Sequence, residues 1–523
     1  MKSLHVMGKS GVAIALLLLG GAGWMAACSD DDNSGTSRGD AGQDATPRDT
    51  GAQQDTSTQD TGSQACHAQR PPVASAKLAF SSGLANYDAA YGKALGVIQA
   101  DVKNGVFIAG QNWDQVWTRD TSYSIDLGAG LLYPDVAKKT LEGMTEDDAF
   151  GKVWIQDKAG HFGGWPNLSD AIVGAQGAWS LYLTTGDQAL LEWSYGITAN
   201  SLKRAERDVF KSDAGLFGGC SSFMESNSGY PKKYENTKTG LAETKALSTN
   251  LLYYRGYVVA AKMATLLNKP SEAAGFEAKA EALKKAINDR LWMADKGYYA
   301  YFEEKDGTKE PKMEGTGESF AILWGVADAS KTQSILEKTH ITQWGIPCLW
   351  PQYADWMQYD AGDADYYHNG MVWPFVQGYW GWASTQSKNV PRFQYEFDRI
   401  RALSEKNETF QEFYTPEDGH PDGSPRQLWS ASGYLSMVYH GIFGMTFEPT
   451  GVTFAPVVPP AFAQSTLDNI PYRGMTLHAS VTGTGTEVAK FSVDGTEQAD
   501  HRIPSNLTGA HRVDIVMTQC GQN

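Results

Sequence analysis

Apolar residues recur at helical spacing along most of this chain, from about residue 84 to residue 450. One face of the first such segment carries Tyr91, Leu95, Ile98 and Val102. Hydrophobic residues at intervals of three and four mark a helix that buries one side against its neighbours. The chain is therefore predicted to fold mainly as packed amphipathic helices.

Many more segments of this kind follow. They lie near residues 121–132, 134–146, 169–185, 188–209, 247–261, 276–291, 317–326, 329–339, 370–386, 390–406 and 428–441. About a dozen helices with short connections can pair into six helical hairpins, with alternate helices forming an inner ring. We therefore predict an (α/α)6 toroid over residues 71–450.

The pattern changes after Thr450. Residues 451–523 are short runs rich in Val, Thr and Phe, such as 475–481 and 489–493, separated by Gly, Asn and Pro. Such runs between turn residues are typical of β-strands. A small antiparallel β-sandwich domain is therefore predicted at 451–523, packed against the helices to cover an edge.

Residues 1–28 have the features of an export signal, in which an apolar run too short to span a membrane leads to Met25-Ala-Ala-Cys28. These four residues resemble a bacterial lipobox. The resemblance implies lipidation of Cys28 and a place in the cell envelope, with Ser29 favouring the outer membrane. An ordinary secretory signal is the alternative. Residues 29–70 are predicted to be a disordered tether, because they lack the apolar residues that offset the cost of chain ordering.

The net charge of −16 disfavours nucleic acid and anionic membrane surfaces as partners. The 16 Trp and 24 Tyr residues suit a ligand with flat faces, although core packing explains most of them. We expect a monomer with no metal or cofactor, attached to a membrane only through its N-terminal anchor. The five cysteines fit no zinc pattern. Cys66 and Cys520 are expected to pair, and Cys220 and Cys348 to be buried thiols.

Three segments concentrate carboxylate, guanidinium and indole groups at predicted helix ends, at residues 113–120, 367–374 and 411–416. A sugar offers hydroxyls to charged groups and C–H faces to aromatic rings, and cleaving its glycosidic bond takes two carboxyl groups in different protonation states. The three segments together predict a carbohydrate-cleaving site. Taken singly they have structural explanations, since Asp120 is a good N-cap and residues 368–369 could cap a helix that begins near Gly370.

The same motifs resemble those of the six-hairpin glycosidases. They are Val116-Trp-Thr-Arg-Asp120, Tyr367-His-Asn-Gly-Met-Val-Trp-Pro374, Glu412-Phe-Tyr-Thr-Pro416 and Leu428-Trp-Ser-Ala-Ser432. Their order and spacing are similar to the group of processing α-glucosidases and mannosylglycerate hydrolases, with trehalases and debranching amyloglucosidases more distant. The resemblance implies an (α/α)6 glycoside hydrolase that cleaves α-linked glucosides or mannosides from a chain end with inversion.

By this resemblance Glu412 is the general base. Arg119 and Asp120 would hold hydroxyls of the sugar that is cleaved, and Trp429 is expected to be structural. The predicted substrate-binding residues are Trp117, Arg119, Asp120, His368, Asn369 and Trp373.

The general acid is expected in the segment 221–231, where the family has an Asp and this chain offers only Glu225. The longer side chain moves the proton by one methylene, so either the backbone compensates or Asp170 or Glu243 takes the role. Asp170 also has a structural explanation, because an acidic residue in the first turn of a helix interacts favourably with the helix dipole. Whichever group acts needs a raised pKa, through burial or a nearby carboxylate such as Asp120.

Two other functions remain open on the same fold. An inverting phosphorylase would use inorganic phosphate in place of water and would need no base, which the presence of Glu412 disfavours. A glycan-binding lipoprotein without catalysis would keep the pocket, and the irregular acid position favours it. A polysaccharide lyase would need a Tyr, His and Arg set that the sequence does not assemble.

Overall fold

The computed structural model describes part of the chain. The described residues are 77–155, 165–166, 170–224, 229–234, 238–356 and 366–519. All of them belong to one compact unit, residues 64–523. No helix among them has both the length and the apolar character needed to cross a membrane.

The predicted export signal and tether (residues 1–70) lie outside the described part, and with them Cys28, Ser29 and Cys66. Glu225 and Cys520 lie outside it as well. Lipidation, the disulfide and the identity of the general acid therefore stay predictions. Cys220 and Cys348 are buried thiols, as expected.

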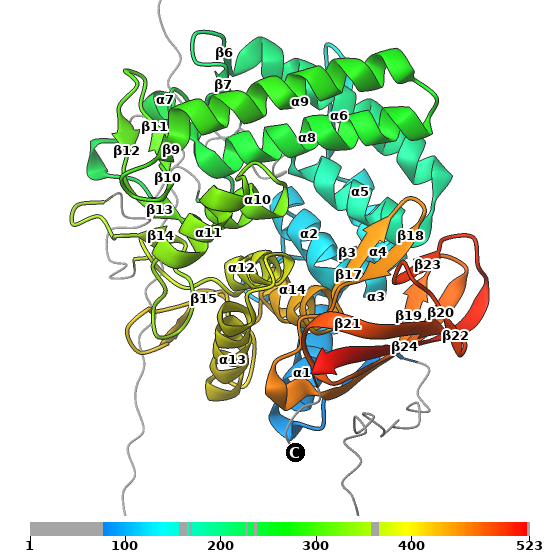
Figure 1. Ribbon diagram of the computed structural model, residues 1–523. Helices are drawn as coiled ribbons and strands as arrows, with labels where there is room; N and C mark the ends of the chain where they lie inside the picture. The colour runs from blue at the N-terminus through cyan, green and yellow to red at the C-terminus, as the bar shows by residue number, and fades with distance from the viewer. Residues whose placement is uncertain are drawn as a thin grey trace, which may run out of the picture. The chain divides into compact units, whose positions relative to one another are not determined.

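Twelve helices of the described chain pair into six hairpins, each with an outer helix followed by an inner one (Figure 1). The outer helices are α1 (Ala85–Ala100), α4 (Pro134–Glu142), α6 (Gln188–Asp208), α9 (Pro270–Leu291), α11 (Ala329–Lys338) and α13 (Val390–Lys406). The inner helices are α2 (Thr118–Ser124), α5 (Val173–Thr185), α8 (Leu247–Leu266), α10 (Gly315–Leu323), α12 (Pro374–Gln386) and α14 (Leu428–Ser436). Short π-helical segments, η1 (Ile125–Ala129) and η3 (Met437–Ile442), extend α2 and α14, and α3 (Gly130–Leu132) and α7 (Lys238–Leu241) are single turns.

The inner helices form a closed ring. Each contacts the next in the order α2, α5, α8, α10, α12, α14, and α14 returns to α2. Helix α14 is buried over its whole length, whereas the buried residues of α9 form a stripe that includes Ala280, Leu283 and Ile287. This is the expected difference between a helix surrounded by others and one with a face in solvent. The predicted (α/α)6 toroid is confirmed.

Two glycines let α12 and α14 approach closely. A β-carbon on Gly433 would lie 2.4 Å from the carbonyl oxygen of Pro374, and one on Gly378 would lie 2.7 Å from the α-carbon of Gly433. No side chain fits between two backbones at such distances. The ring therefore depends on glycine at this crossing.

The connections between helices fall into two classes. Those from an inner helix to the next outer helix are short, as at 186–187, 267–269 and 387–389. Those from an outer to an inner helix are longer and carry the short hairpins of the chain. These strands are β2 (Val102–Lys103), β3 (Val106–Phe107), β4 (Thr145–Asp148), β5 (Gly151–Trp154), β6 (Phe210–Lys211), β7 (Leu216–Phe217), β8 (Lys245–Ala246), β9 (Trp292–Met293), β10 (Tyr298–Tyr299), β11 (Phe302–Glu303), β12 (Lys309–Glu310), β13 (Met313–Glu314), β14 (Leu349–Trp350), β15 (Phe413–Tyr414) and β16 (Pro421–Asp422).

The inner helices all begin at the same end of the barrel, so the longer connections gather there. We call this end the site pole. The other end, where the inner helices finish, is called the opposite pole. It carries the hairpin of β17 (Met445–Glu448) and β18 (Gly451–Phe454), which follows α14 and η3.

The C-terminal strands form two sheets. A six-stranded sheet has the order β1-β19-β20-β24-β21-β22, and a three-stranded sheet has the order β17-β18-β23. Their remaining strands are β1 (Ala79–Ser81), β19 (Gln464–Tyr472), β20 (Met475–Thr482), β21 (Thr484–Val493), β22 (Thr496–Glu497), β23 (Arg502–Pro504) and β24 (Gly509–Gln519). The larger sheet is mixed, because β20 and β24 run parallel within an otherwise antiparallel arrangement. The predicted antiparallel pairing therefore holds for the other strand pairs of the two sheets and not for this one.

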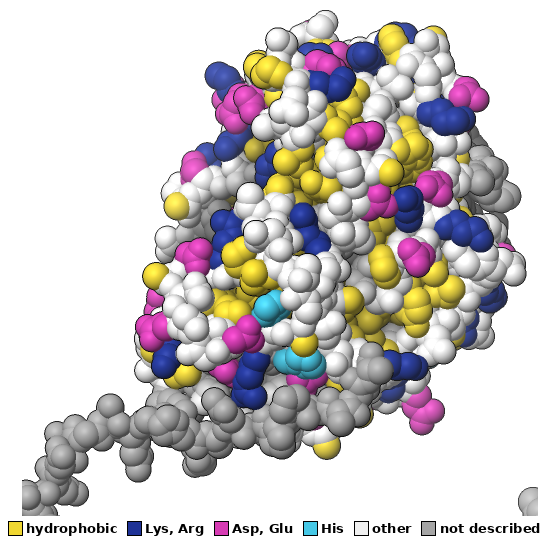
Figure 2. Space-filling model, turned by 90° about the vertical axis from the view of Figure 1, so that its right-hand side faces the viewer, with side chains coloured by type: hydrophobic (Ala, Val, Ile, Leu, Met, Phe, Trp, Pro, Cys, Tyr) yellow, Lys and Arg dark blue, Asp and Glu magenta, His cyan; other side chains and the backbone are white. Residues whose placement is uncertain are grey.

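The sheets are anchored to the toroid by strand pairing and by ring packing. Strand β1, which precedes the first helix, pairs with β19. Phe462 packs against Tyr87 of α1 and Phe397 of α13, with ring centroids 4.8 and 5.2 Å apart. The β part thus packs against the helical part, as predicted, and the contacts of Phe462 are with the outer helices α1 and α13. Figure 2 shows the face on the right of Figure 1, where groups of apolar side chains lie between charged ones.

Candidate active site

The three motif segments meet at the site pole because each leads into an inner helix. Trp117 occupies the N-cap position of α2, Trp373 that of α12 and Gln427 that of α14. Asp120 is therefore the third residue of α2 and not its cap. The helix that follows His368 begins at Pro374, so residues 368–369 do not cap it either.

Glu412 is the most completely held carboxylate of the site. Its Oε2 accepts hydrogen bonds from Trp113 Nε1 and from the backbone N–H of Ser424, both at 2.7 Å. Its Oε1 accepts a longer bond of 3.4 Å from the Tyr367 hydroxyl. Gly423 makes this approach possible, because a β-carbon there would lie 2.5 Å from Glu412 Oε2.

The setting of Glu412 raises its pKa to about 7. Burial is the main cause, and the hydrogen bonds from Trp113 and Ser424 oppose it by stabilising the carboxylate. A carboxyl group with a pKa near neutrality can both accept and release a proton in the physiological range. With Oε2 occupied by two donors, Oε1 is the oxygen that has capacity left to accept a proton.

Asp120 lies close enough to Glu412 for the two charges to interact. Burial raises the pKa of Asp120 to about 7, Arg119 opposes the rise and Glu412 adds to it. Its Oδ1 accepts a bond of 3.3 Å from Gln427 Nε2. Within the described residues its Oδ2 is buried and has no hydrogen-bond partner. A sugar hydroxyl is a suitable donor for such an oxygen.

Arg119 is oriented by Asp170. The two form a buried ion pair of 3.4 Å between Nε and Oδ2, with both side chains at most 3% exposed. Asp170 lies before α5. Its carboxylate pairs with Arg119, so the structural explanation as an acidic residue of the first turn of α5 does not account for its position. Asp170 thus belongs to the site as the partner of the predicted hydroxyl-binding guanidinium.

Aromatic rings surround these groups, but they differ in exposure. Trp113 and Trp117 are half-buried neighbours with ring centroids 6.2 Å apart, and each retains open surface. Trp373 is 1% exposed and is enclosed by Phe413, Tyr367 and His368. In this arrangement Trp117 offers a face to a ligand, whereas Trp373 supports the side chains around it.

His368 and Asn369 are both buried, and they have different surroundings. His368 stacks on Trp373, and burial together with the Arg119 charge holds the pKa of His368 well below its usual range. It is therefore neutral at neutral pH. The Asn369 amide accepts from the backbone N–H of Tyr353 at 2.7 Å and donates to the carbonyl oxygen of Tyr353 at 3.0 Å. Asn369 thus fixes the neighbouring loop.

Glu243, one of the candidate general acids, has surroundings that keep it ionised. Glu243 lies near Lys211 and Lys305, and its hydrogen bond with Lys211 lowers its pKa. A carboxylate that stays ionised at neutral pH cannot donate a proton there, so Glu243 is a poor general acid.

The predicted acid, Glu225, lies outside the described residues. Phe223, two residues before it, packs edge-on against His368 and Trp373 at 5.2 and 5.3 Å.

Sequence reasoning missed several contributors to the site. Trp113, Tyr367 and Ser424 hold Glu412, and Gln427 bonds Asp120, yet none was assigned a role. Trp113 and Tyr367 lie inside the motif segments, so their place in these segments could have indicated a role.

Trp429, expected to be structural, stacks on Phe375 with ring centroids 4.2 Å apart. Its indole N–H is buried and has no hydrogen-bond partner in the described part.

A further buried carboxylate, Glu314, lies at the start of α10. It accepts hydrogen bonds from the Ser221 hydroxyl and the Ser248 backbone, and burial raises its pKa to about 7. These bonds tie the connection before α8, the first turn of α8 and the connection before α10 together. Within the described ranges, no three His, Cys, Asp or Glu side chains are grouped as a metal site would require.

The chain matches a protein-family model. It is described as the mannosylglycerate hydrolase MGH1-like glycoside hydrolase domain and aligns with residues 167–430. A mannosylglycerate hydrolase from Rubrobacter radiotolerans is 26% identical over 180 residues. That alignment covers 32% of this chain and 38% of the relative, so it spans well under half of the relative's length.

Solved structures share the fold at low identity. The GH63 mannosylglycerate hydrolase from Thermus thermophilus in complex with glucose has a TM-score of 0.54 and 14% identity, over 66% of this chain and 99% of that one. The GH78 rhamnosidase of Bacillus sp. GL1 has a TM-score of 0.59 and 14% identity, over 86% of this chain and 44% of that one. At this identity the likeness concerns the fold alone.

Proposed function

The chain belongs to the MGH1-like glycoside hydrolase family, and we propose that it cleaves α-linked glucosides or mannosides from a chain end with inversion at the anomeric carbon. In the proposed reaction a water molecule attacks the anomeric carbon while the bond to the glycosidic oxygen breaks. Glu412 takes a proton from the water, and Glu225 gives a proton to the departing oxygen. An α-glycoside then yields a β-anomer first.

The setting of Glu412 is the observation that carries this proposal. Two donors fix one carboxylate oxygen and leave the other with a single long bond, and the pKa is about 7. A base is needed to activate water but not to use inorganic phosphate, whose own charge a buried carboxylate would repel. The arrangement therefore favours hydrolysis over phosphorolysis.

The groups around Glu412 suit recognition of a sugar ring. In the described chain, the buried Oδ2 of Asp120 has no hydrogen-bond partner, and neither has the buried indole N–H of Trp429. Arg119, oriented by Asp170, adds charged donors. A sugar hydroxyl both donates and accepts, so one hydroxyl or two neighbouring ones can satisfy groups of both kinds.

The relatives indicate which substrates to test first. Because two of them are named mannosylglycerate hydrolases, we include mannosylglycerate with neutral α-mannosides and α-glucosides. Proton NMR would follow which anomer of the free sugar appears before mutarotation, with and without inorganic phosphate. The tested chains are wild type, Glu412→Gln and Glu225→Gln, with Glu243→Gln as a matched control outside the site.

Each outcome distinguishes one function from the others. Initial β-anomer, lost in the first two variants and retained in Glu243→Gln, is the expected result. Initial α-anomer would refute inversion, and a sugar phosphate formed only with added phosphate would indicate a phosphorylase. Binding without turnover of any substrate would support the catalytically silent glycan-binding protein.

A further inference from the structure

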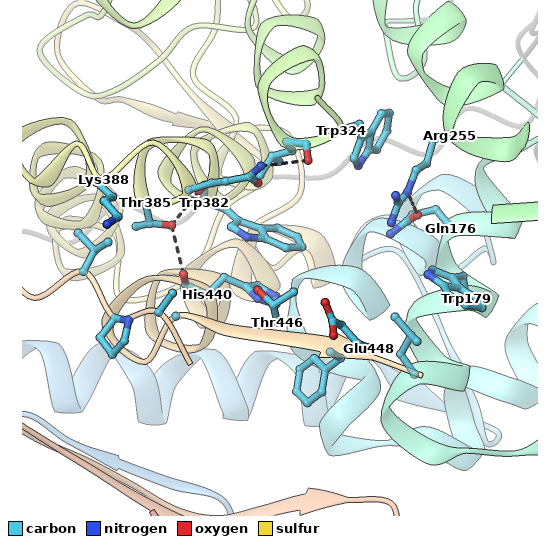
Figure 3. A pocket seen from close by; sticks show the side chains of 18 of the residues that line it. Gln176, Trp179, Arg255, Trp324, Trp382, Thr385, Lys388, His440, Thr446 and Glu448 are labelled. Atoms are coloured by element: carbon cyan, nitrogen blue, oxygen red, sulfur yellow. Dashed lines mark hydrogen bonds between the residues drawn. The ribbon is translucent and has the colours of Figure 1, made fainter. Parts of the chain in front are cut away.

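A second pocket, of about 400 Å³, lies at the opposite pole of the barrel (Figure 3). Its lining comes from the final turns of inner helices, including Leu323 of α10 and Trp382 of α12, and from strand β17. It shares no lining residue with the candidate active site at the other pole. Small-molecule sites are typically about 300–1,000 Å³, so the volume suits one or two sugar rings.

Two half-buried indoles present aromatic surface to this pocket. Trp382 stacks on His440 with centroids 3.8 Å apart, and Trp324 stacks on Phe320 at 4.1 Å. In each case one ring face is covered and part of the indole remains exposed. An indole fixed from behind offers its remaining surface to the C–H face of a sugar. The Arg255 guanidinium also lies over the Trp324 ring, 5.8 Å from its centroid.

Two cations of α8 also line the pocket. Arg255 and Lys262 are seven residues apart, which is about two helical turns and places both on one side of the helix. Arg255 donates from Nε to Gln176 Oε1 at 2.7 Å, as Figure 3 shows. In the described part of the chain, neither cation has a carboxylate within ion-pair distance. Burial lowers the pKa of Arg255, and partial desolvation together with the Arg255 charge lowers the pKa of Lys262.

The nearby carboxylates are already engaged. Glu448, which lines the pocket, pairs with Arg502 at 2.8 Å, and Arg502 is not a lining residue. Asp126, whose charge acts on Arg255, accepts three hydrogen bonds, from Gln176 at 2.9 Å, Ser180 at 2.6 Å and Tyr379 at 3.0 Å. Among the described residues no carboxylate therefore forms a direct ion pair with Arg255 or Lys262, and these two cations remain available to a ligand.

We propose that this pocket is a non-catalytic binding site for a saccharide unit that carries a carboxylate, such as a uronic acid. The sugar ring packs on the open surface of Trp382 and Trp324, and its carboxylate is held by Arg255 and Lys262. A planar guanidinium matches the two oxygens of a carboxylate, which a neutral sugar lacks.

Calorimetric titration of the full chain carrying Glu412→Gln tests this site without turnover. The probes are methyl α-D-glucuronide and, as the neutral control, methyl α-D-glucoside. Glucuronide is expected to bind at least roughly tenfold more tightly than glucoside, because a hydrogen bond to a charged group is worth about 1.5–3 kcal/mol. In the Glu412→Gln chain, a second substitution, Arg255→Gln, should weaken glucuronide binding by roughly tenfold or more. Lys262→Gln in the same background should weaken it by about threefold.

Two controls distinguish binding in this pocket from nonspecific charge attraction and from binding at the site pole. Lys296→Gln removes an exposed lysine that does not line the pocket, and it should leave the affinity unchanged. Asp120→Asn alters the site pole and should also leave glucuronide binding intact. Equal affinity for the two probes, no binding of glucuronide, or loss of binding in Asp120→Asn but not in Lys262→Gln would overturn the proposal. Lys262 is exposed, so this variant decides the test even if Arg255→Gln fails to fold.

Discussion

Glu412 is held by hydrogen-bond donors that act against the effect of its burial. Burial alone favours the protonated carboxyl group, whereas Trp113 Nε1 and the Ser424 N–H stabilise the carboxylate. One pKa unit corresponds to about 1.4 kcal/mol, which is the size of one charge-assisted hydrogen bond. Each donor therefore has a measurable effect on the pH at which Glu412 can act as a base.

Trp113→Phe should shift the acidic limb of the pH profile. The variant removes the indole N–H and keeps an aromatic ring, so the pKa of Glu412 rises further above 7. Because a general base must be ionised, the acidic limb of kcat/KM should move to higher pH by about one unit. Tyr367→Phe removes the longer, 3.4 Å bond to Glu412 and should produce a smaller shift. A limb that stays in place, or moves to lower pH, would contradict this role of Trp113.

Gly423→Ala should impair activity through the position of Glu412. Gly423 has φ +73°, and a β-carbon there would meet the carboxylate oxygen that Ser424 binds. We expect kcat to fall by roughly tenfold or more, since a displacement on the order of 1 Å at a reacting group has effects of that order or larger. Gly495→Ala is the control, because its φ is +79° and its β-carbon would contact nothing within 4 Å. A kcat in Gly423→Ala that equals the kcat of Gly495→Ala would contradict a role of this contact in positioning Glu412.

The helices illustrate which elements local pattern can predict. The segment 390–406, predicted from apolar residues at helical spacing, has the bounds of α13. In the structure Asn389 caps this helix and Pro391 lies in its first turn, two signals that fix where it begins. The segment 370–386 was predicted to start four residues early. Gly370 has φ +100° and Tyr367 φ +41°, so this stretch is a loop that presents side chains to the site.

Gly433→Ala tests the close crossing of α12 and α14. The added methyl group would meet the Pro374 carbonyl oxygen, a backbone atom that cannot turn away. Unfolding in denaturant should show a loss of about 1–3 kcal/mol, the usual cost of overpacking a core. Gly275→Ala on α9 is a matched change in a helix where the β-carbon meets nothing. It should be neutral or stabilising by up to about 1 kcal/mol, since alanine favours the helix. A similar loss in both variants would rule out the proposed crowding.

At the scale of the whole molecule, the site depends on contacts that no local pattern contains. Trp113 and Glu412 are 299 positions apart, and Arg119 meets Asp170 only because α2 and α5 are neighbours in the ring. The motifs indicated which residues to consider, and the closed ring determines which of them touch. The parallel pair β20 and β24 and the pairing of β1 with β19 are likewise set by topology.

The buried carboxylates give the molecule a predictable response to pH. Burial raises the pKa to about 7 for Asp101, Asp120, Glu314, Glu396 and Glu412. In the unfolded chain such groups titrate near pH 4. Between about pH 4 and pH 7 the folded chain therefore binds more protons than the unfolded chain, and the free energy of unfolding falls as pH rises through this range.

Glu396→Gln should reduce this loss of stability without touching the candidate site. Glu396 is buried on α13 and accepts a hydrogen bond from Gln377 at 3.0 Å, so glutamine removes a titrating group of similar shape. The wild-type Tm should be lower at pH 8 than at pH 5, and the difference should shrink in the variant. Glu487→Gln, in which an exposed partner of Lys388 with a lowered pKa is neutralised, should leave the difference unchanged. If Glu396→Gln lowered the Tm equally at pH 5 and pH 8, the buried carboxyl would act only through its hydrogen bond, and its ionisation would not limit stability at neutral pH.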